Sequence, residues 1–160
     1  MRRIIVVVLT ALALALSAVP ASAAGAGAVS ETIHLDNAPF AMPGALLCTD
    51  PLIVGNLSGT ESGVIHTTVL TSGIGAGTFW VTGTLRGQIT LVTATTTYTG
   101  TFVVWFGDNN NLRNEANTFT LNVKLTAPDG TTTSVHQVAH FNSAGTTSID
   151  PNMFFKVGCH

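Results

Sequence analysis

The segment Lys124–Val135, KLTAPDGTTTSV, places a Pro-Asp-Gly turn between two stretches in which apolar and polar residues alternate. Proline presets the first dihedral angle of a turn and glycine supplies the positive one, so this pattern is typical of a β-hairpin. If Ala127 pairs with Thr131, each strand has one apolar and one polar face, and a slip of one residue would mix the two. The apolar face would collect Phe119, Leu121, Val123, Val135, Gln137, Ala139 and Phe141, and the polar face Thr118, Thr120, Asn122, Lys124, Ser134, His136, Val138 and His140.

Two histidines of this hairpin, His136 and His140, stand four residues apart, which is the spacing of a metal-binding pair on a helix. On a strand, which rises about 3.3 Å per residue, the same spacing separates them by roughly 13 Å. Two imidazoles so placed cannot both approach one zinc ion to about 2.1 Å. We therefore predict no metal site here. The polar face would either be exposed to solvent or, if it lined a barrel, form a polar pocket that includes Asn122.

The rest of the chain shows a similar strand-like sequence pattern. Threonine, valine and glycine dominate, in short runs broken by turn residues roughly every eight to twelve positions. This predicts an all-β fold, an antiparallel β-barrel of about eight strands, with a β-sandwich as the alternative. The expected strands are Glu31–Asp36, Pro51–Leu57, Gly63–Thr71, Gly77–Leu85, Gln88–Thr97, Thr101–Phe106, Asn117–Thr126, Thr131–Phe141 and Asn152–Val157.

The beginning of the chain has the three-part layout of a secretory signal peptide. Arg2 and Arg3 precede an uninterrupted run of apolar and small residues, and Ala21-Ser22-Ala23 then offers a small-x-small cleavage pattern. We expect a signal peptide over 1–23, a flexible lead-in over 24–30 and a single secreted β-barrel domain over 31–160. The alternative is an uncleaved membrane anchor, for which the apolar run is slightly short.

The net charge of the expected secreted domain limits the classes of partner that it can bind. Eight acidic residues face only four basic ones after the leader, Arg86, Arg113, Lys124 and Lys156. Proteins that bind nucleic acid carry a basic patch, and attachment to anionic lipid needs clustered basic residues. We therefore expect neither nucleic acid nor, after signal cleavage, a membrane as the partner.

Cys48 and Cys159 are the two cysteines of the chain. An even number of cysteines in an exported protein predicts a disulfide bond, with two buried free thiols as the alternative. In the chain-entropy model, a bond that closes so long a loop stabilises the fold by about 4–5 kcal/mol.

Three further features bear on function. TFVVWFG, Thr101–Gly107, is apolar on both faces of a strand, so it is either covered by a neighbour or exposes a partner surface built on Trp105. The loop Asn109–Asn111 offers oxygen atoms that suit a cation or a sugar, although asparagine also favours plain loops. Signatures of covalent catalysis are absent: there is no GxSxG elbow and no close pair of carboxylates.

The chain resembles small secreted β-proteins of actinobacteria that have no assigned role. The resemblance rests on TGTLRGQITL, the Tyr98-Thr99-Gly100 turn, WFGDNNN and the late strand with His136 and His140, and it extends from Leu52 to Cys159. It implies a secreted β-domain and provides no catalytic residues.

These observations favour a secreted, non-catalytic protein that binds a small molecule or an extracellular protein without a cofactor. The candidate ligand-binding residues are Trp105, Asn122, His136 and His140. The alternative is a hydrolase-like or cyclase-like barrel enzyme that pairs a pocket histidine with a carboxylate.

Overall fold

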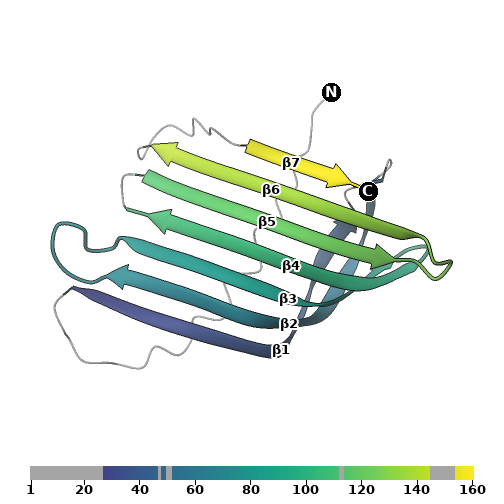
Figure 1. Ribbon diagram of the computed structural model, residues 1–160, viewed down its shortest axis with the longest axis horizontal. Coiled ribbons are helices and arrows are strands. Elements are labelled where there is room, and N and C mark those ends of the chain that lie inside the picture. Colours follow the sequence, from purple (N-terminus) through teal and green to yellow (C-terminus); the bar gives the residue numbers. More distant parts are fainter. Residues whose placement is uncertain (1–26, 47, 50–51, 112–113, 145–153) are drawn as a thin grey trace.

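The computed structural model of the protein describes residues 27–46, 48–49, 52–111, 114–144 and 154–160. They form one antiparallel sheet of seven strands in the order of the sequence (Figure 1). Its strands are β1 (Ala28–Leu46), β2 (Ile53–Leu70), β3 (Phe79–Thr93), β4 (Thr97–Asn110), β5 (Asn114–Thr126), β6 (Thr132–Ala144) and β7 (Phe154–Cys159). The expected all-β, antiparallel fold is confirmed.

The hairpin read from the sequence has the predicted register. Val123 lies opposite Val135 and Phe119 opposite Ala139 in the β5–β6 pair. The N–H of Ala127 donates to the carbonyl oxygen of Thr131 at 2.9 Å. The alternation of apolar and polar residues therefore fixed both the pairing and the two faces, as expected where one face of a sheet is buried.

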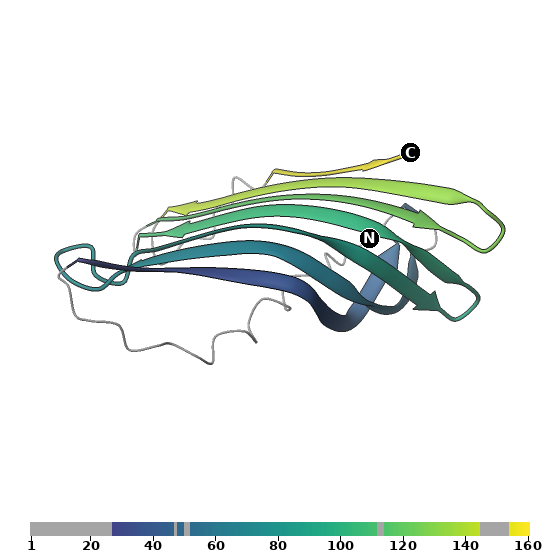
Figure 2. The ribbon, with the colours of Figure 1, turned by 60° about the horizontal axis from the view of Figure 1, so that its bottom comes forward.

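The expected barrel is not closed. Each strand pairs only with its sequence neighbours, and within the described residues no backbone ladder joins β1 to β7. Instead β1 and β2 bend sharply, and their far halves curl behind the sheet (Figures 1 and 2). The result is a curved open sheet with a concave inner face and a convex outer face.

The bend coincides with a β-bulge in β1. The register of β1 against β2 shifts between Leu35 and Ala38, and Asn37 adopts a φ of 50°. Asparagine tolerates this left-handed region better than other residues with a side chain. The N–H of Asn37 donates to Oγ of Ser62 at 2.9 Å, which satisfies the backbone group that the bulge leaves unpaired. Bulges bend a strand and increase its twist, and here the bulge starts the curl.

The core lies in the concavity that this curl creates. Phe40, beyond the bulge in β1, contacts Phe102 of β4 edge-to-face with ring centroids 5.7 Å apart. The two strands are not neighbours in the sheet, so the contact shows β1 folded over the inner face. The buried apolar residues are Leu46, Leu85, Ile89, Leu91, Phe102, Val104, Leu125 and Val135.

The expected disulfide bond is present. Cys48 follows β1 and Cys159 ends β7, and their Cα atoms are 5.7 Å apart. The bond connects the curled end of the first strand to the last strand, so it ties together the two edges that no ladder joins.

Several element boundaries differ from the expected ones. The predicted breaks at residues 58–62, at Arg86-Gly87 and at Thr99-Gly100 lie inside single long strands, β2, β3 and β4. Strand β1 begins at Ala28, within the expected lead-in. The signal peptide over 1–23 lies outside the described residues. The described residues contain no helix long and apolar enough to cross a membrane.

Candidate functional site

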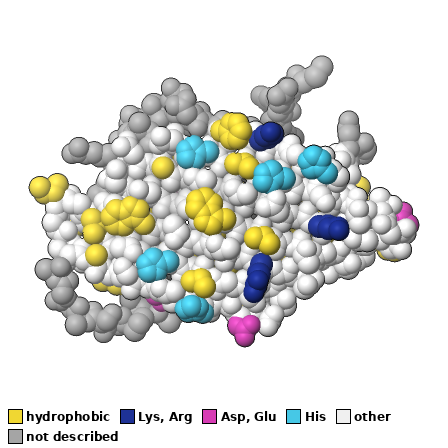
Figure 3. All heavy atoms as spheres, viewed as in Figure 1, with side chains coloured by type: hydrophobic (Ala, Val, Ile, Leu, Met, Phe, Trp, Pro, Cys, Tyr) yellow, Lys and Arg dark blue, Asp and Glu magenta, His cyan; other side chains and the backbone are white. Residues whose placement is uncertain are grey.

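The candidate site is the convex outer face of the sheet, which shows aromatic and histidine side chains to solvent (Figure 3). Side chains alternate between the faces of a strand, so the register assigns each residue to one face. Val103 and Trp105 of β4 are 46% and 45% exposed, whereas Phe102 and Val104 between them are buried. The apolar run TFVVWFG is thus covered on one face only, and its other face supplies an exposed patch.

The four sequence candidates share this outer face. Asn122 and His136 lie opposite each other in β5 and β6, and Oδ1 of Asn122 is 2.6 Å from Nδ1 of His136. His140 lies opposite Thr118, with Nδ1 2.9 Å from its Oγ1. Trp105 is two strands from β6, which corresponds to about 10 Å. The polar face of the hairpin therefore points to solvent and does not line an interior.

Other histidines that the sequence did not single out join the same face. Nδ1 of His66 is 2.7 Å from Oγ1 of Thr32 across the β1–β2 pair, and His34 lies two residues beyond Thr32 on the same side. His160 follows β7, and its backbone pairs with Ser134. His34, His66, His136, His140 and His160, which are all five histidines of the chain, are exposed on the outer face.

The cationic residues of the described chain also belong to this face. Arg86 lies opposite Val103, Lys124 opposite Ser134, and Lys156 opposite Val138. Figure 3 shows their side chains among the histidines, with acidic side chains only near the margin of this view. Asp36 lies at the bulge of the edge strand β1, and Asp129 lies in the β5–β6 turn.

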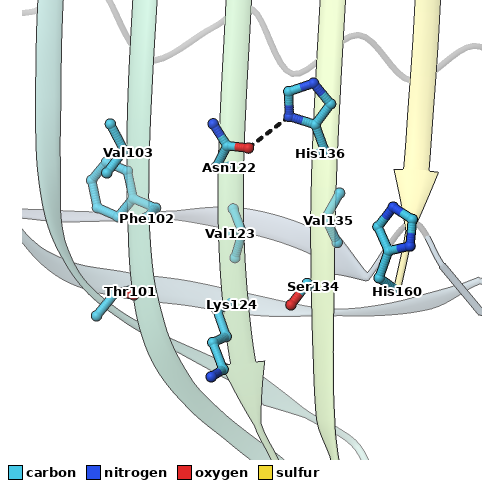
Figure 4. Close-up of a pocket in the computed structure, with 10 residues that line it drawn as sticks. All are labelled: Thr101, Phe102, Val103, Asn122, Val123, Lys124, Ser134, Val135, His136 and His160. Carbon is cyan, nitrogen blue, oxygen red and sulfur yellow. Dashed lines mark hydrogen bonds between the residues drawn. The ribbon is translucent and has the colours of Figure 1, made fainter.

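Two shallow hollows mark the outer face. The first, of about 340 Å³, is bordered by side chains of β4, β5, β6 and His160 (Figure 4). Lys124, His136 and His160 surround it, and Asn122 holds His136 by the hydrogen bond already described. The second, of about 220 Å³, is lined by Val64, His66, Thr82, Gly83, Thr84 and Trp105.

Carboxylates are found mainly on the inner face. Glu61 is level with Phe102, and Asp108 lies opposite Asn117 in a row that continues to Phe141. Burial raises the pKa of Glu61. Burial, and then the negative charge of Glu115, raise the pKa of Asp108, although a hydrogen bond from the backbone of Asn109 opposes this. One buried oxygen of Asp108 has no hydrogen-bond partner.

This separation of charges bears on the alternative function. An acid–base pair needs a histidine and a carboxylate within about 3 Å of each other. His66, His136 and His140 hydrogen-bond to threonine or asparagine, and Glu61, Asp108 and Glu115 lie on the other side of the sheet. Asp150 is outside the described residues. Among the described residues, no group of three or more histidine, cysteine, aspartate or glutamate side chains could hold a metal ion.

The Asp108→Asn variant tests whether the charge of the partly buried Asp108 carboxylate destabilises the fold. A carboxyl group whose pKa is raised by folding binds protons more readily in the folded state, so stability falls as pH rises through the ordinary value near 3.8 to the raised one. We expect the variant to be more stable than the wild type at pH 7 and to lose less stability as pH rises from about 4 to 7. Urea unfolding across this range measures both effects. Asp129→Asn is the control of opposite sign, because hydrogen bonds from Thr131 lower the pKa of the exposed Asp129; an equal flattening there would contradict the assignment.

The loop Asn109–Asn111 is shorter than the sequence suggested. Strand β4 continues to Asn110 and β5 begins at Asn114, so Asn109 and Asn110 are strand residues. No protein-family model, curated protein or solved structure matches the chain.

Proposed function

We propose that the protein is a secreted, non-catalytic binding protein that docks an extracellular partner on the outer face of its sheet. The observation that carries the proposal is the exposure of Trp105 beside Val103 and Val64, which are 45%, 46% and 40% exposed. Tryptophan is enriched at the energetic centres of interfaces because it combines a large apolar area with a hydrogen-bond donor. The disulfide bond is consistent with an extracellular location.

The form of the site supports a surface partner over a small molecule held inside the fold. A ligand-binding barrel needs a connected internal cavity. Here Phe102, Leu125 and Val135 are buried on the inner face, and Phe119, Leu121 and Val123 pack against them. Both hollows described above open on the outer face, and they are shallow. A partner that covers an area of the sheet fits this surface.

Trp105→Ala tests the proposal. Wild-type protein and variant would be passed over immobilised dextran, polygalacturonate and poly-L-glutamate at pH 5 and pH 7.5. We expect at least one polymer to retain the wild type, and removal of the indole to weaken retention at least about tenfold, as for other central interface residues.

Ile74→Ala is the matched control for this experiment. Ile74 is fully exposed in the turn between β2 and β3, so the variant also removes an exposed apolar side chain, but away from the outer face. It should bind as the wild type does. Retention by none of the polymers, or an equal loss in both variants, would contradict the proposed function.

A further inference from the structure

Away from its margin, the outer face carries charge of one sign only. In the described rows that cross it from β1 to β7, the ionisable side chains are Arg86, Lys124, Lys156 and the five histidines, with no aspartate or glutamate among them. The whole chain is nonetheless acidic, with a formal net charge of −2 when the histidines are neutral. The cations are therefore concentrated on one side of the sheet.

Histidine gives this arrangement a dependence on pH. It is the side chain that gains its charge between about pH 5 and 8. The face carries the charges of three side chains at neutral pH, and its five histidines are of the side-chain type that adds positive charge as pH falls. All five are exposed, and His66, His136 and His140 hydrogen-bond to neutral partners.

The groups that face each histidine on neighbouring strands are neutral or cationic. His66 is flanked by Thr32 and Thr82, and His34 by Val64. His136 lies between Asn122 and Gly158, and His140 between Thr118 and Phe154. His160 lies beside Ser134. The nearest acidic side chain on β1 is Asp36, at the margin of the face, where its Oδ1 accepts a hydrogen bond from Asn37.

Both hollows are lined in part by residues of β4, and they present side chains of different chemical character next to each other. Trp105 lines one hollow and Val103, two residues away and so about 7 Å along the strand, lines the other. The indole lies beside Gly107, where an added Cβ would be in ordinary van der Waals contact with Cη2 at 3.7 Å. One hollow thus offers an aromatic platform with His66, and the next offers Lys124, His136 and His160.

We infer that the outer face binds an acidic polysaccharide, a chain of carboxylated sugars, and that this binding strengthens as pH falls. The inference rests on the proposed function and names its partner. An apolar face of a sugar ring would stack on Trp105, and a carboxylate further along the same chain would lie in the hollow of Lys124, His136 and His160. Threonine and asparagine side chains between them supply hydrogen bonds to hydroxyl groups. A chain ligand is favoured over a single sugar because the hollows are adjacent and shallow.

The charge also excludes a second copy as the occupant. Two protonated outer faces would repel each other, because each is cationic at the pH at which the histidines are charged. An acidic polymer has the opposite charge, so protonation strengthens its attraction to the same surface.

The experiment uses polygalacturonate as the probe, with dextran as its neutral counterpart and poly-L-glutamate as an acidic chain without sugar rings. We expect the wild type to bind polygalacturonate at pH 5 and at least about tenfold more weakly at pH 7.5, and to bind both other polymers at least about tenfold more weakly at pH 5. Equal binding to poly-L-glutamate would overturn the assignment to a polysaccharide. Binding to any polymer that depends on Trp105 but not on pH would overturn this inference and leave the proposed function standing.

Paired substitutions separate charge from shape. In His136→Gln/His140→Gln the face loses two protonatable groups, and binding at pH 5 should fall at least about fivefold. In His136→Lys/His140→Lys the charges persist at pH 7.5, so binding there should rise toward the acid level of the wild type. If the His136→Lys/His140→Lys variant binds polygalacturonate at pH 7.5 no better than the wild type does, the inference is contradicted. Should either variant fail to fold, the salt dependence of wild-type binding at pH 5 decides, because charge-driven binding weakens as salt increases.

Discussion

The Cys48→Ser/Cys159→Ser variant is expected to lose about 4–5 kcal/mol of its free energy of unfolding. The bond joins residues 111 positions apart. In the chain-entropy model, a cross-link over roughly 100 residues removes enough freedom from the unfolded chain to stabilise the fold by about 4.7 kcal/mol. A domain of this size has only about 5–15 kcal/mol in total, so the variant would be close to unfolding at ambient temperature.

Topology adds a second reason for a large effect. Strands β1 and β7 are the edges of the sheet, and within the described chain the bond is the covalent tie between the curled end of β1 and β7. Without it, the segment that carries Leu46 is free to leave the inner face and uncover the core. Equilibrium unfolding in urea measures the loss. The midpoint should fall, and the free energy of the variant should depend more steeply on urea, because its unfolded chain exposes more surface than the cross-linked wild type.

The control is the wild type in reducing agent, which should unfold at the same urea concentration as the double variant. Both cysteines are replaced together because a single substitution leaves a thiol that can pair between molecules. A double variant within about 1 kcal/mol of the oxidised wild type would show that strand pairing alone holds the curl in place.

The part of the fold that the sequence predicted is the part governed by local alternation. The register of the β5–β6 hairpin was predicted correctly, because its turn chemistry and its two-faced pattern demand one register, although both strands extend beyond the predicted ends. The same alternation runs through Phe102, Val103, Val104 and Trp105, but every residue there is apolar. The pattern could not tell which side was buried, and the structure assigns Val103 and Trp105 to solvent.

The long strands escaped prediction because their glycines resemble turns. Gly87, in the expected Arg-Gly turn, lies in the middle of β3 on the inner face, where a Cβ would overlap the carbonyl oxygen of Thr60. Glycine in a strand can mark a place where another backbone comes close. Here that backbone is the one at Thr60 in the neighbouring strand β2, and its close approach is evident only from the curved sheet. The strand expected to end at Asp36 continues as β1 through Pro39 and Pro43, which an edge strand accepts.

The candidate site was predicted in part for a related reason. Asn122, His136 and His140 come from one hairpin, so local pattern placed them together on one face. His66 joins them only through the β2–β3 pairing, His34 only through the β1–β2 pairing, which includes a bulge, and His160 only through β7. The clustering of cations on the outer face is therefore a property of the whole sheet. No window of the sequence contains it, because each strand other than β4 contributes only one or two of the cationic residues.

The Leu91→Ala variant is expected to lose about 2–5 kcal/mol of its free energy of unfolding, the range for removing a large buried side chain. Leu91 is the most deeply buried large side chain described, 1% exposed, and it lies where β1 folds over β3: an added Cβ on Gly44 would be 3.4 Å from its Cδ1. Its neighbour Val92 points to the other face and is 46% exposed, so Val92→Ala is the matched control and should cost less than about 0.5 kcal/mol. Thermal and urea unfolding measure both variants. Equal losses would mean that the curled end of β1 does not cover the inner face at this point, because burial of Leu91 depends on that cover whereas exposure of Val92 does not.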